Sequence, residues 1–324
     1  MLSKRKESLK GKIVAITGGA GFVGSHLTHR LLEEGAEVHL IVRESTSLWR
    51  LSSFKDSLSL HISDVSSSSD MNRTIQKINP SYFFHLSAYG VDASKKDYIT
   101  ATKINVLAIA NIFSALKYID CKKVILLGSS SEYGEVDHRI TEDTPLKPVN
   151  IYGSTKACGT ILAHQLGSEN NIPVITFRPF GLFGEGEEPH KLFAYVILQS
   201  LKEKDINLTK GEQYRDYLYV ENLIDALILA CEDSTLRNEI FNIGSGVSKP
   251  LRYYSDLIIS LTETTSKVNY GAIAYRKNEI WNPSPDINKI RARLHWNPKI
   301  PLEKGLVNTI NWFKENLFNY NDIL

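Results

Sequence analysis

The feature that most constrains the fold of this chain is a glycine-rich turn between a buried strand and a helix. The segment KIVAITG (12–18) has the apolar, β-branched character of a buried strand, and SHLTHRLLEEG (25–35) has helical periodicity with a terminal glycine. Gly18 and the series Gly19-x-Gly21-x-x-Gly24 lie between them. Small residues let the backbone approach a pyrophosphate, which the free N–H groups of the helix N-terminus then bind. The pattern in this context predicts a dinucleotide site.

Strand-like and helical segments continue to alternate after this unit. Further strands are predicted at 37–42, 82–88, 123–130 and 174–180, with a long helix at 99–119. Such alternation indicates an α/β fold of the Rossmann type, a doubly wound parallel sheet with helices on both faces. We expect this dinucleotide-binding domain over 1–180. A smaller, mixed α/β substrate-binding region is expected over 181–324, with a segment near 219–245 returning to the first domain.

Composition excludes several classes of protein. The chain has 324 residues and a net charge of +2, so nothing in its charge favours nucleic acid. We find no signal peptide and no apolar run of membrane-spanning length, and therefore expect no membrane partner. The three cysteines, Cys121, Cys158 and Cys231, lack metal-binding spacing. We expect no metal site and a reduced, cytoplasmic location.

The residues after the second strand bear on which dinucleotide binds. A site for NAD places a carboxylate there, about 20 residues beyond the glycines, to hold the ribose. Here the position falls near Val42, and Arg43 follows it. The 2′-phosphate of NADP(H) could be bound by the charges and hydroxyl groups of Arg43, Ser45, Ser47 and Arg50. NADP(H) is therefore favoured. NAD(H) stays open because Glu44 could reach the ribose. Asp64 is either an adenine contact or a turn residue.

Seven ordered motifs give the chain its resemblance to a known family. They are TGGAGFVG (17–24), HLSA (85–88), GSSSEYG (128–134), YGSTK (152–156), FRPFGLFG (177–184), RDYLYVEN (215–222) and FNIGSG (241–246). Together they resemble the extended short-chain dehydrogenase/reductase family, in its nucleotide-sugar branch. The resemblance covers nearly the whole chain.

The resemblance implies that Tyr152 and Lys156 are the catalytic pair and that Ser129 hydrogen-bonds the reacting oxygen. Hydride transfer at a sugar carbon requires a proton to move on the attached oxygen, which a tyrosine can carry. Its ordinary pKa of about 10 is expected to fall because the Lys156 ammonium and the positive nicotinamide both favour phenolate. Without the other motifs, Tyr152 and Lys156 would be two residues on one solvated helix face.

Binding residues follow from the same motifs and from the loop after the second strand. The expected cofactor contacts are Gly18, Gly21, Phe22, Val23, Gly24, Arg43, Ser45, Ser47, Arg50, Asp64, Val65, Leu86, Ser87, Ala88, Tyr152, Lys156 and Phe180. The expected substrate contacts are Ser129, Ser130, Ser131, Gly181, Arg215 and Arg276. Arg215 resembles an arginine that contacts the nucleotide diphosphate; an ion pair with Asp216 or Glu212 is the alternative. Asn105 is expected to be structural.

Departures from the family pattern narrow the reaction. Ser130 and Ser131 stand where the family's 4,6-dehydratases carry an Asp-Glu pair, although Glu132 follows directly, so dehydration is disfavoured. Gly181 stands where many epimerases carry an asparagine, so the sugar is not readable. We expect an NADPH-dependent 4-ketoreductase of a nucleotide-linked 4-keto-6-deoxy sugar, or a 4-epimerase that retains NAD. A non-catalytic dinucleotide sensor is less favoured. A homodimer through the Tyr152 helix and the 99–119 helix is expected.

Overall fold

A seven-stranded parallel sheet forms the larger part of the molecule. The computed structural model describes residues 8–92, 97–276 and 279–320. Within them the strand order is β10-β6-β5-β4-β1-β2-β3, and every neighbouring pair is parallel. The order reverses between β1 and β4, which is the usual ligand-binding position in such sheets. The strands are β1 (Ile13–Thr17), β2 (Glu37–Val42), β3 (Ser59–Ile62), β4 (Tyr82–His85), β5 (Lys123–Leu127), β6 (Val174–Pro179) and β10 (Glu239–Ile243). The predicted α/β class is confirmed.

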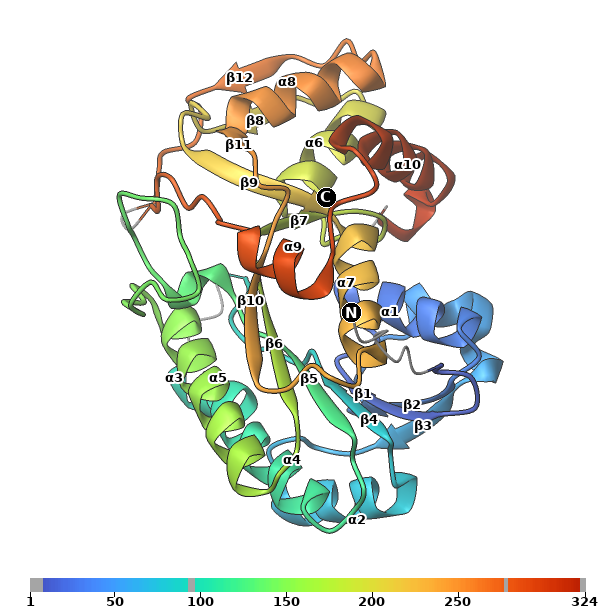
Figure 1. Ribbon diagram of the computed structural model, residues 1–324. Coiled ribbons are helices and arrows are strands. Elements are labelled where there is room, and N and C mark those ends of the chain that lie inside the picture. The colour runs from blue at the N-terminus through green and yellow to red at the C-terminus, as the bar shows by residue number, and fades with distance from the viewer. Residues whose placement is uncertain (1–7, 93–96, 277–278, 321–324) are drawn as a thin grey trace.

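Helices cover both faces of this sheet (Figure 1). α2 (Ser68–Ile78), α4 (Ala108–Leu116) and α5 (Ile151–Glu169) bury their apolar residues against one face. On the other face, α1 (Phe22–Glu33) packs beside α7 (Val220–Glu232), and a 3-10 segment, η1 (Trp49–Ser57), lies near α1. The long apolar runs in the strands follow from this coverage, since strands buried on both faces need no polar alternation.

The helix expected over 99–119 is interrupted. α3 (Tyr98–Thr102) passes into a π-helical turn, η2 (Lys103–Leu107), before α4 begins. The expectation that no run reaches membrane-spanning length is wrong here: within the described residues, one stretch, Tyr98–Leu116, is long and apolar enough by length and composition. Half of it is buried in the fold, because α4 packs between α2 and α5. Its apolar character therefore reflects core packing.

The smaller region lies beyond the carboxyl ends of the strands (Figure 1). A three-stranded mixed sheet has the order β11-β9-β7, from β7 (Gly181–Phe183), β9 (Tyr214–Tyr219) and β11 (Ser248–Pro250). A parallel pair joins β8 (Ile206–Leu208) to β12 (Val268–Tyr270). The surrounding helices are α6 (Leu192–Leu201), α8 (Leu251–Thr262), α9 (Asn288–Leu294) and α10 (Leu302–Glu315), followed by a 3-10 turn, η4 (Leu317–Tyr320). One continuous apolar core runs from α1 and α7 into these helices.

Candidate active site

The glycine turn after β1 has no room for a side chain at Gly18 or Gly24. Gly18 has a φ of +76°, and a Cβ there would lie 2.6 Å from the Ser87 nitrogen and 2.7 Å from the Leu86 carbonyl carbon. A Cβ on Gly24 would overlap the Gly18 carbonyl oxygen. Gly21 is the N-cap of α1, with its N–H donated to Gly18 O. The turn thus closes against the end of β4 and leaves the first N–H groups of α1 at the sheet edge, as pyrophosphate binding requires.

Other predicted cofactor contacts come to the same edge from neighbouring strands. Leu86 donates its N–H to Thr17 O, which aligns the ends of β4 and β1. Val65 is buried just beyond β3, and its carbonyl accepts a bond from Asn111. Phe180, at the end of β6, donates its N–H to Ile243 O. Phe22 and Val23 open α1, and Ala88 follows Ser87 with its side chain exposed.

An open cavity of about 550 Å³ lies beyond the ends of β2 and β3. Its lining includes Arg43, Glu44, Ser45 and Asp64. Asp64 accepts two bonds from Ser66, through the backbone N–H and the hydroxyl, so it also organises its own turn. The structure therefore brings Arg43 and Ser45 together with the predicted adenine contact.

Arg50, also predicted to contact the phosphate, is not among the residues that line this cavity. Its Nε donates to Gly186 O at 2.7 Å, its Nη2 pairs with Glu188 at 2.8 Å, and the guanidinium stacks on Trp49. The side chain thus ties η1 to the loop after β7. Ser47 is likewise outside the residues that line the cavity. The partners of Arg50 lie 136 and 138 residues away in the sequence, so local spacing carried no sign of them.

Tyr152 and Lys156 lie on the first turns of α5, next to the end of β5. Asn150 caps this helix by accepting the Gly153 N–H. A Cβ on Gly153 would overlap the Ser131 carbonyl oxygen, so the glycine allows α5 to touch the short turn η3 (Ser130–Glu132). Lys156 Nζ donates to Leu127 O at 2.5 Å. Ser129 is the N-cap of η3, and its side chain accepts the Ser131 N–H at 3.1 Å.

The protonation of this pair differs from the expected one. Burial raises the pKa of Tyr152 to about 12; hydrogen bonding to Ser129 opposes the rise, and the charge of Glu132 adds to it. Burial lowers the pKa of Lys156 to about 8, against the charge of Glu132. For each group the effect of desolvation is the largest. The protein's own groups therefore favour the neutral phenol, and a positively charged nicotinamide would act in the opposite direction when bound.

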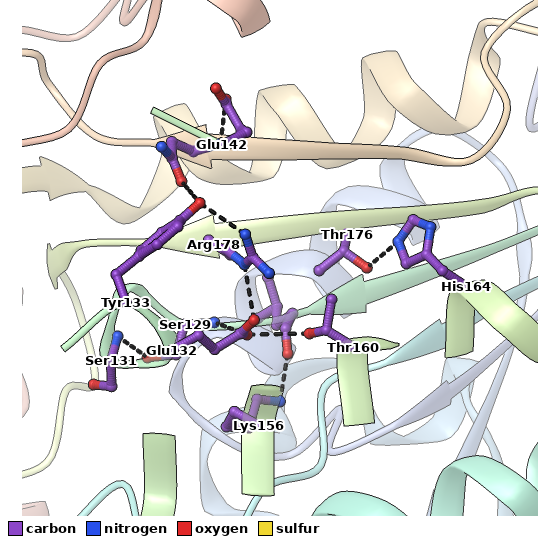
Figure 2. Close-up of polar contacts among 12 residues, drawn as sticks. Ser129, Ser131, Glu132, Tyr133, Glu142, Lys156, Thr160, His164, Thr176 and Arg178 are labelled. Atoms are coloured by element: carbon purple, nitrogen blue, oxygen red, sulfur yellow. Dashed lines mark hydrogen bonds and ion pairs between the residues drawn. The ribbon is translucent and has the colours of Figure 1, made fainter. Parts of the chain in front are cut away.

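Glu132 directly follows the serines that stand where the family's dehydratases carry their two acids. It is fully buried, and its two oxygens accept bonds from the Ser129 N–H, Thr160 and Arg178 (Figure 2). Ser130 and Ser131, which are partly exposed, occupy the more open positions of the turn. A carboxylate held in this way cannot approach a sugar. The structure thus gives no available acid in the turn for dehydration.

Tyr217 takes the space that a side chain at Gly181 would need. β7 and β9 pair so that Gly181 lies opposite Tyr217, and a Cβ on the glycine would be 2.6 Å from the tyrosine ring and 2.6 Å from the Asp216 carbonyl oxygen. Burial raises the pKa of Tyr217, and the charges of Arg215 and Arg276 act against this rise. The charges of both predicted substrate arginines therefore act on Tyr217, a residue that sequence reasoning missed.

Arg215 has a partner that sequence reasoning did not foresee. Its guanidinium pairs with Glu279 at 2.5 Å and donates to Tyr214 O at 2.6 Å. Neither of the two acids named as alternatives is its partner. Asp216 is instead buried and accepts the Ser245 N–H at 2.6 Å, and burial raises its pKa to about 6.

Asn105 has the structural role expected of it. It exchanges two hydrogen bonds with the backbone of Tyr89 and donates a third to Thr155, each at 2.9 Å. These bonds join the π-helical turn to α5 and to the loop after β4. The helix that carries the catalytic pair is thereby fixed to the cofactor edge of the sheet.

Fold and site together define a class of protein, a nicotinamide-dinucleotide enzyme with a Ser-Tyr-Lys group at the carboxyl edge of its sheet. Residues 14–244 match the model of the NAD dependent epimerase/dehydratase family. The chain belongs to this family, which confirms its resemblance to the nucleotide-sugar branch of the extended short-chain dehydrogenases/reductases.

Similar proteins cover nearly the whole chain. The UDP-glucuronate 4-epimerase of Thermodesulfobacterium geofontis is 27% identical over 93% of this chain and 96% of its own length. The structure of UDP-glucose 4-epimerase from Thermotoga maritima with UDP-glucose is 26% identical, has a TM-score of 0.87, and covers 94% of this chain and 99% of its own. MoeE5 in complex with UDP-glucose and NAD is 25% identical, with a TM-score of 0.81 and coverage of 94% and 99%.

Proposed function

We propose that this protein is an NADPH-dependent 4-ketoreductase of a nucleotide-linked 4-keto-6-deoxy sugar. The observation that carries the proposal is the end of β2, where buried Val42 replaces the ribose-binding carboxylate and Arg43 and Ser45 line the adjoining cavity. A guanidinium and a hydroxyl suit a 2′-phosphate. A cofactor of this kind is consumed and exchanged, as a reductase requires. The loss of Arg50 from the expected phosphate site leaves Arg43 as its cation.

The state of Tyr152 fits reduction. When a keto group accepts a hydride, its oxygen needs a proton, and a neutral phenol can donate one. Burial keeps Tyr152 in that neutral form. In this proposal Ser129 donates a hydrogen bond to the keto oxygen, Tyr152 supplies the proton, and Lys156 holds the nicotinamide ribose. Arg215 and Arg276 bind the diphosphate beside Tyr217, and Ser130, Ser131 and Gly181 face the sugar.

A 4-epimerase that retains NAD is the second candidate, because the similar proteins include 4-epimerases of UDP-sugars that match over nearly the whole chain. In that reaction Tyr152 first acts as a base and then returns the proton. Glu44, which shares the cavity with Arg43, would then take the ribose hydroxyls.

The test compares two incubations of the purified full chain. One contains NADPH and a nucleotide-linked 4-keto-6-deoxy sugar; the other contains UDP-glucose or UDP-galactose without added cofactor. Loss of NADPH absorbance in the first supports the reductase, and Tyr152→Phe should abolish it. Turnover only in the second overturns the reductase in favour of the epimerase. Absence of hydride transfer in both would favour a non-catalytic sensor.

Two arginine variants test the cofactor assignment with a built-in control. Arg43→Ala should raise the KM for NADPH about tenfold or more and change that for NADH little, as loss of one charged phosphate contact predicts. Arg50→Ala should leave the preference between the two cofactors unchanged, since its guanidinium binds Gly186 and Glu188. Equal effects of both variants on NADPH would contradict the assignment.

We further propose a cytoplasmic homodimer. Ile99, Leu107 and Ile161 are at least 43% exposed on η2 and the helices α3 and α5, where a second copy could cover them. Light scattering after size exclusion measures the mass, and Ile161→Glu should yield monomers if this face is the interface. A monomeric wild type would contradict the proposal.

A further inference from the structure

Glu132 occupies the point where the catalytic elements meet. Its side chain is fully buried. Oε1 accepts the backbone N–H of Ser129 at 2.8 Å and the hydroxyl of Thr160 at 3.1 Å. Ser129 precedes η3, whereas Thr160 lies on α5 one turn after Lys156. One oxygen atom therefore joins the serine turn to the helix that carries the tyrosine and the lysine.

The second carboxylate oxygen of Glu132 is bound by Arg178, which lies on β6. Oε2 accepts Arg178 Nε at 2.8 Å, and Arg178 Nη1 donates to the Tyr133 hydroxyl, also at 2.8 Å. That hydroxyl donates to Asn242 Oδ1 at 2.7 Å (Figure 2). The ion pair is almost inaccessible, with side-chain exposures of 3% and 0%. A buried ion pair often contributes no more stability than packed apolar residues would, so stability alone does not account for this one.

Packing leaves the carboxylate no alternative position. A Cβ on Gly128 would lie 2.6 Å from Glu132 Oε1, so the glycine before Ser129 makes room for the acid. Ser129 Oγ in turn accepts the Ser131 N–H at 3.1 Å, which completes a reciprocal capping box with Glu132. The serine hydroxyl is thereby aimed by the same turn that the acid fixes.

We propose that Glu132 is a positioning residue for the Ser129, Tyr152 and Lys156 group, in which one carboxylate oxygen joins the two segments that carry them and Arg178 holds the carboxylate in its charged form. The inference rests on the proposed catalytic roles of these three residues. It does not depend on which nucleotide sugar is the substrate, or on the direction of hydride transfer.

The charge of Glu132 also acts on the pair it positions. The charged and titratable groups around this carboxylate are Arg178 on β6, Tyr133 on η3's C-cap, and Tyr152 and Lys156 on α5; His85 on β4 faces Lys156. The negative charge of Glu132 raises the pKa of both Tyr152 and Lys156. Without it, phenolate is less disfavoured and the ammonium is less favoured, so both pKa values fall. A purely structural bond would not have this effect.

The main test is Glu132→Gln, which keeps an oxygen acceptor and removes the charge. In the reductive direction, where Tyr152 must be protonated, we expect the alkaline limb of the kcat/KM profile to move about half a pH unit or more toward low pH, as for loss of one nearby charge. The kcat should fall about tenfold or more, with little change in KM, because the three groups lose their alignment. Tyr133→Phe is the matched control: it breaks the same network and keeps the charge and the ring under Arg178. It should lower stability without moving the pH profile.

Thr160→Val tests the positional role alone. It removes the α5 bond to Oε1 and no charge, so kcat should fall while the alkaline limb stays in place. This variant decides the question if Glu132→Gln does not fold. Wild-type kcat in Thr160→Val, or an unmoved pH profile in a folded Glu132→Gln, would overturn the proposal.

A measurement without substrate separates this inference from the proposed function. The side-chain amines of isotope-labelled lysines can be titrated by NMR, with the Lys156 signal assigned by its loss in Lys156→Met. In the wild type it should titrate near pH 8 and in Glu132→Gln at lower pH. A wild type inactive on every sugar tested would refute the proposed function yet leave this titration readable. An unchanged titration would refute the influence of Glu132 even in an active enzyme.

Discussion

Glutamine in place of Glu187 is expected to stabilise this protein at alkaline pH and to leave its stability almost unchanged near pH 5. Glu187 lies in the loop after β7 and is 6% exposed. Its Oε2 has no hydrogen-bond partner within the described part of the chain. Burial raises the pKa of Glu187 from 4.5 to about 8, although the charge of Lys191 acts against the rise. The carboxyl group is therefore protonated in the folded protein at neutral pH.

The sign and the size of the effect follow from proton linkage. Between pH 4.5 and about 8 the folded chain keeps a proton at Glu187 that the unfolded chain has lost, so stability falls as pH rises through this range. At about 1.4 kcal/mol per pKa unit, the ceiling of the loss is about 5 kcal/mol. Relaxation of the loop around an ionised carboxylate reduces this, and we expect about 1 to 3 kcal/mol above pH 8. Glutamine has no proton to lose and avoids the penalty.

The assay is urea unfolding, followed by the fluorescence of the four tryptophans, at several pH values between about 5 and 9. The free energy of unfolding of Glu187→Gln minus that of the wild type should grow steadily with pH. Glu188→Gln is the matched control, since the neighbouring side chain is 49% exposed and forms a surface ion pair with Arg50. Its effect should stay below about 1 kcal/mol. A Glu187→Gln difference that is constant with pH would refute the reasoning.

Three further substitutions test the site and its support. Gly24→Ala should abolish dinucleotide binding in calorimetry, because the new methyl group overlaps the Gly18 carbonyl oxygen; wild-type affinity would contradict the phosphate site. Gly181→Asn should raise the substrate KM about tenfold, and adding Tyr217→Ala should recover part of the loss; no recovery would show that the ring is not the obstacle. Asn105→Ala should lower the free energy of unfolding by about 2 kcal/mol in urea titrations, since three hydrogen bonds are lost; an unchanged value would contradict its anchoring role.

The parts of this structure that could be predicted from sequence are those determined by residues close together in the chain. The β1 turn and α1 are contiguous, so the glycine spacing and the flanking periodicities define their geometry within about one helical turn. Tyr152 and Lys156 share a face because they are four residues apart on one helix. The alternation of strands and helices then limits the sheet to a parallel one, and the family resemblance supplied the roles.

The features that sequence reasoning missed depend on contacts between distant segments. Arg43 and Arg50 looked equivalent because both follow β2, yet only Arg43 lines the cavity, since Gly186 and Glu188 engage Arg50. Nothing local distinguishes them. The sequence showed Glu132 only as an acid directly after the serines, since its partners Thr160 and Arg178 are 28 and 46 residues away. Burial likewise reversed the expected pKa shift of Tyr152, an effect that depends on the folded surroundings and not on its neighbours in sequence.

The loop after β7 shows how such contacts change the interpretation of a segment. Its glycines and acids, GEGEEPH (184–190), are typical of a loop. In the structure this loop is hydrogen-bonded to several elements. Glu185 binds His26 of α1 and Tyr219 of β9. The carbonyl groups of Gly186 and Glu187 accept bonds from Arg50 and Tyr320, respectively.

A loop tied to both regions in this way cannot move freely when ligands bind. The residues next to it, Gly181 at one end and Lys191 at the other, are therefore held in place before substrate arrives, and Lys191 extends the connection by donating to Val91 O near the end of β4. Preformed contacts of this kind reduce the entropy lost on binding. Glu187 Oε2, which is buried without a hydrogen-bond partner in the described structure, is a destabilising feature of this rigid loop. Glu187→Gln should therefore stabilise the fold most at alkaline pH, where the wild-type carboxylate is charged.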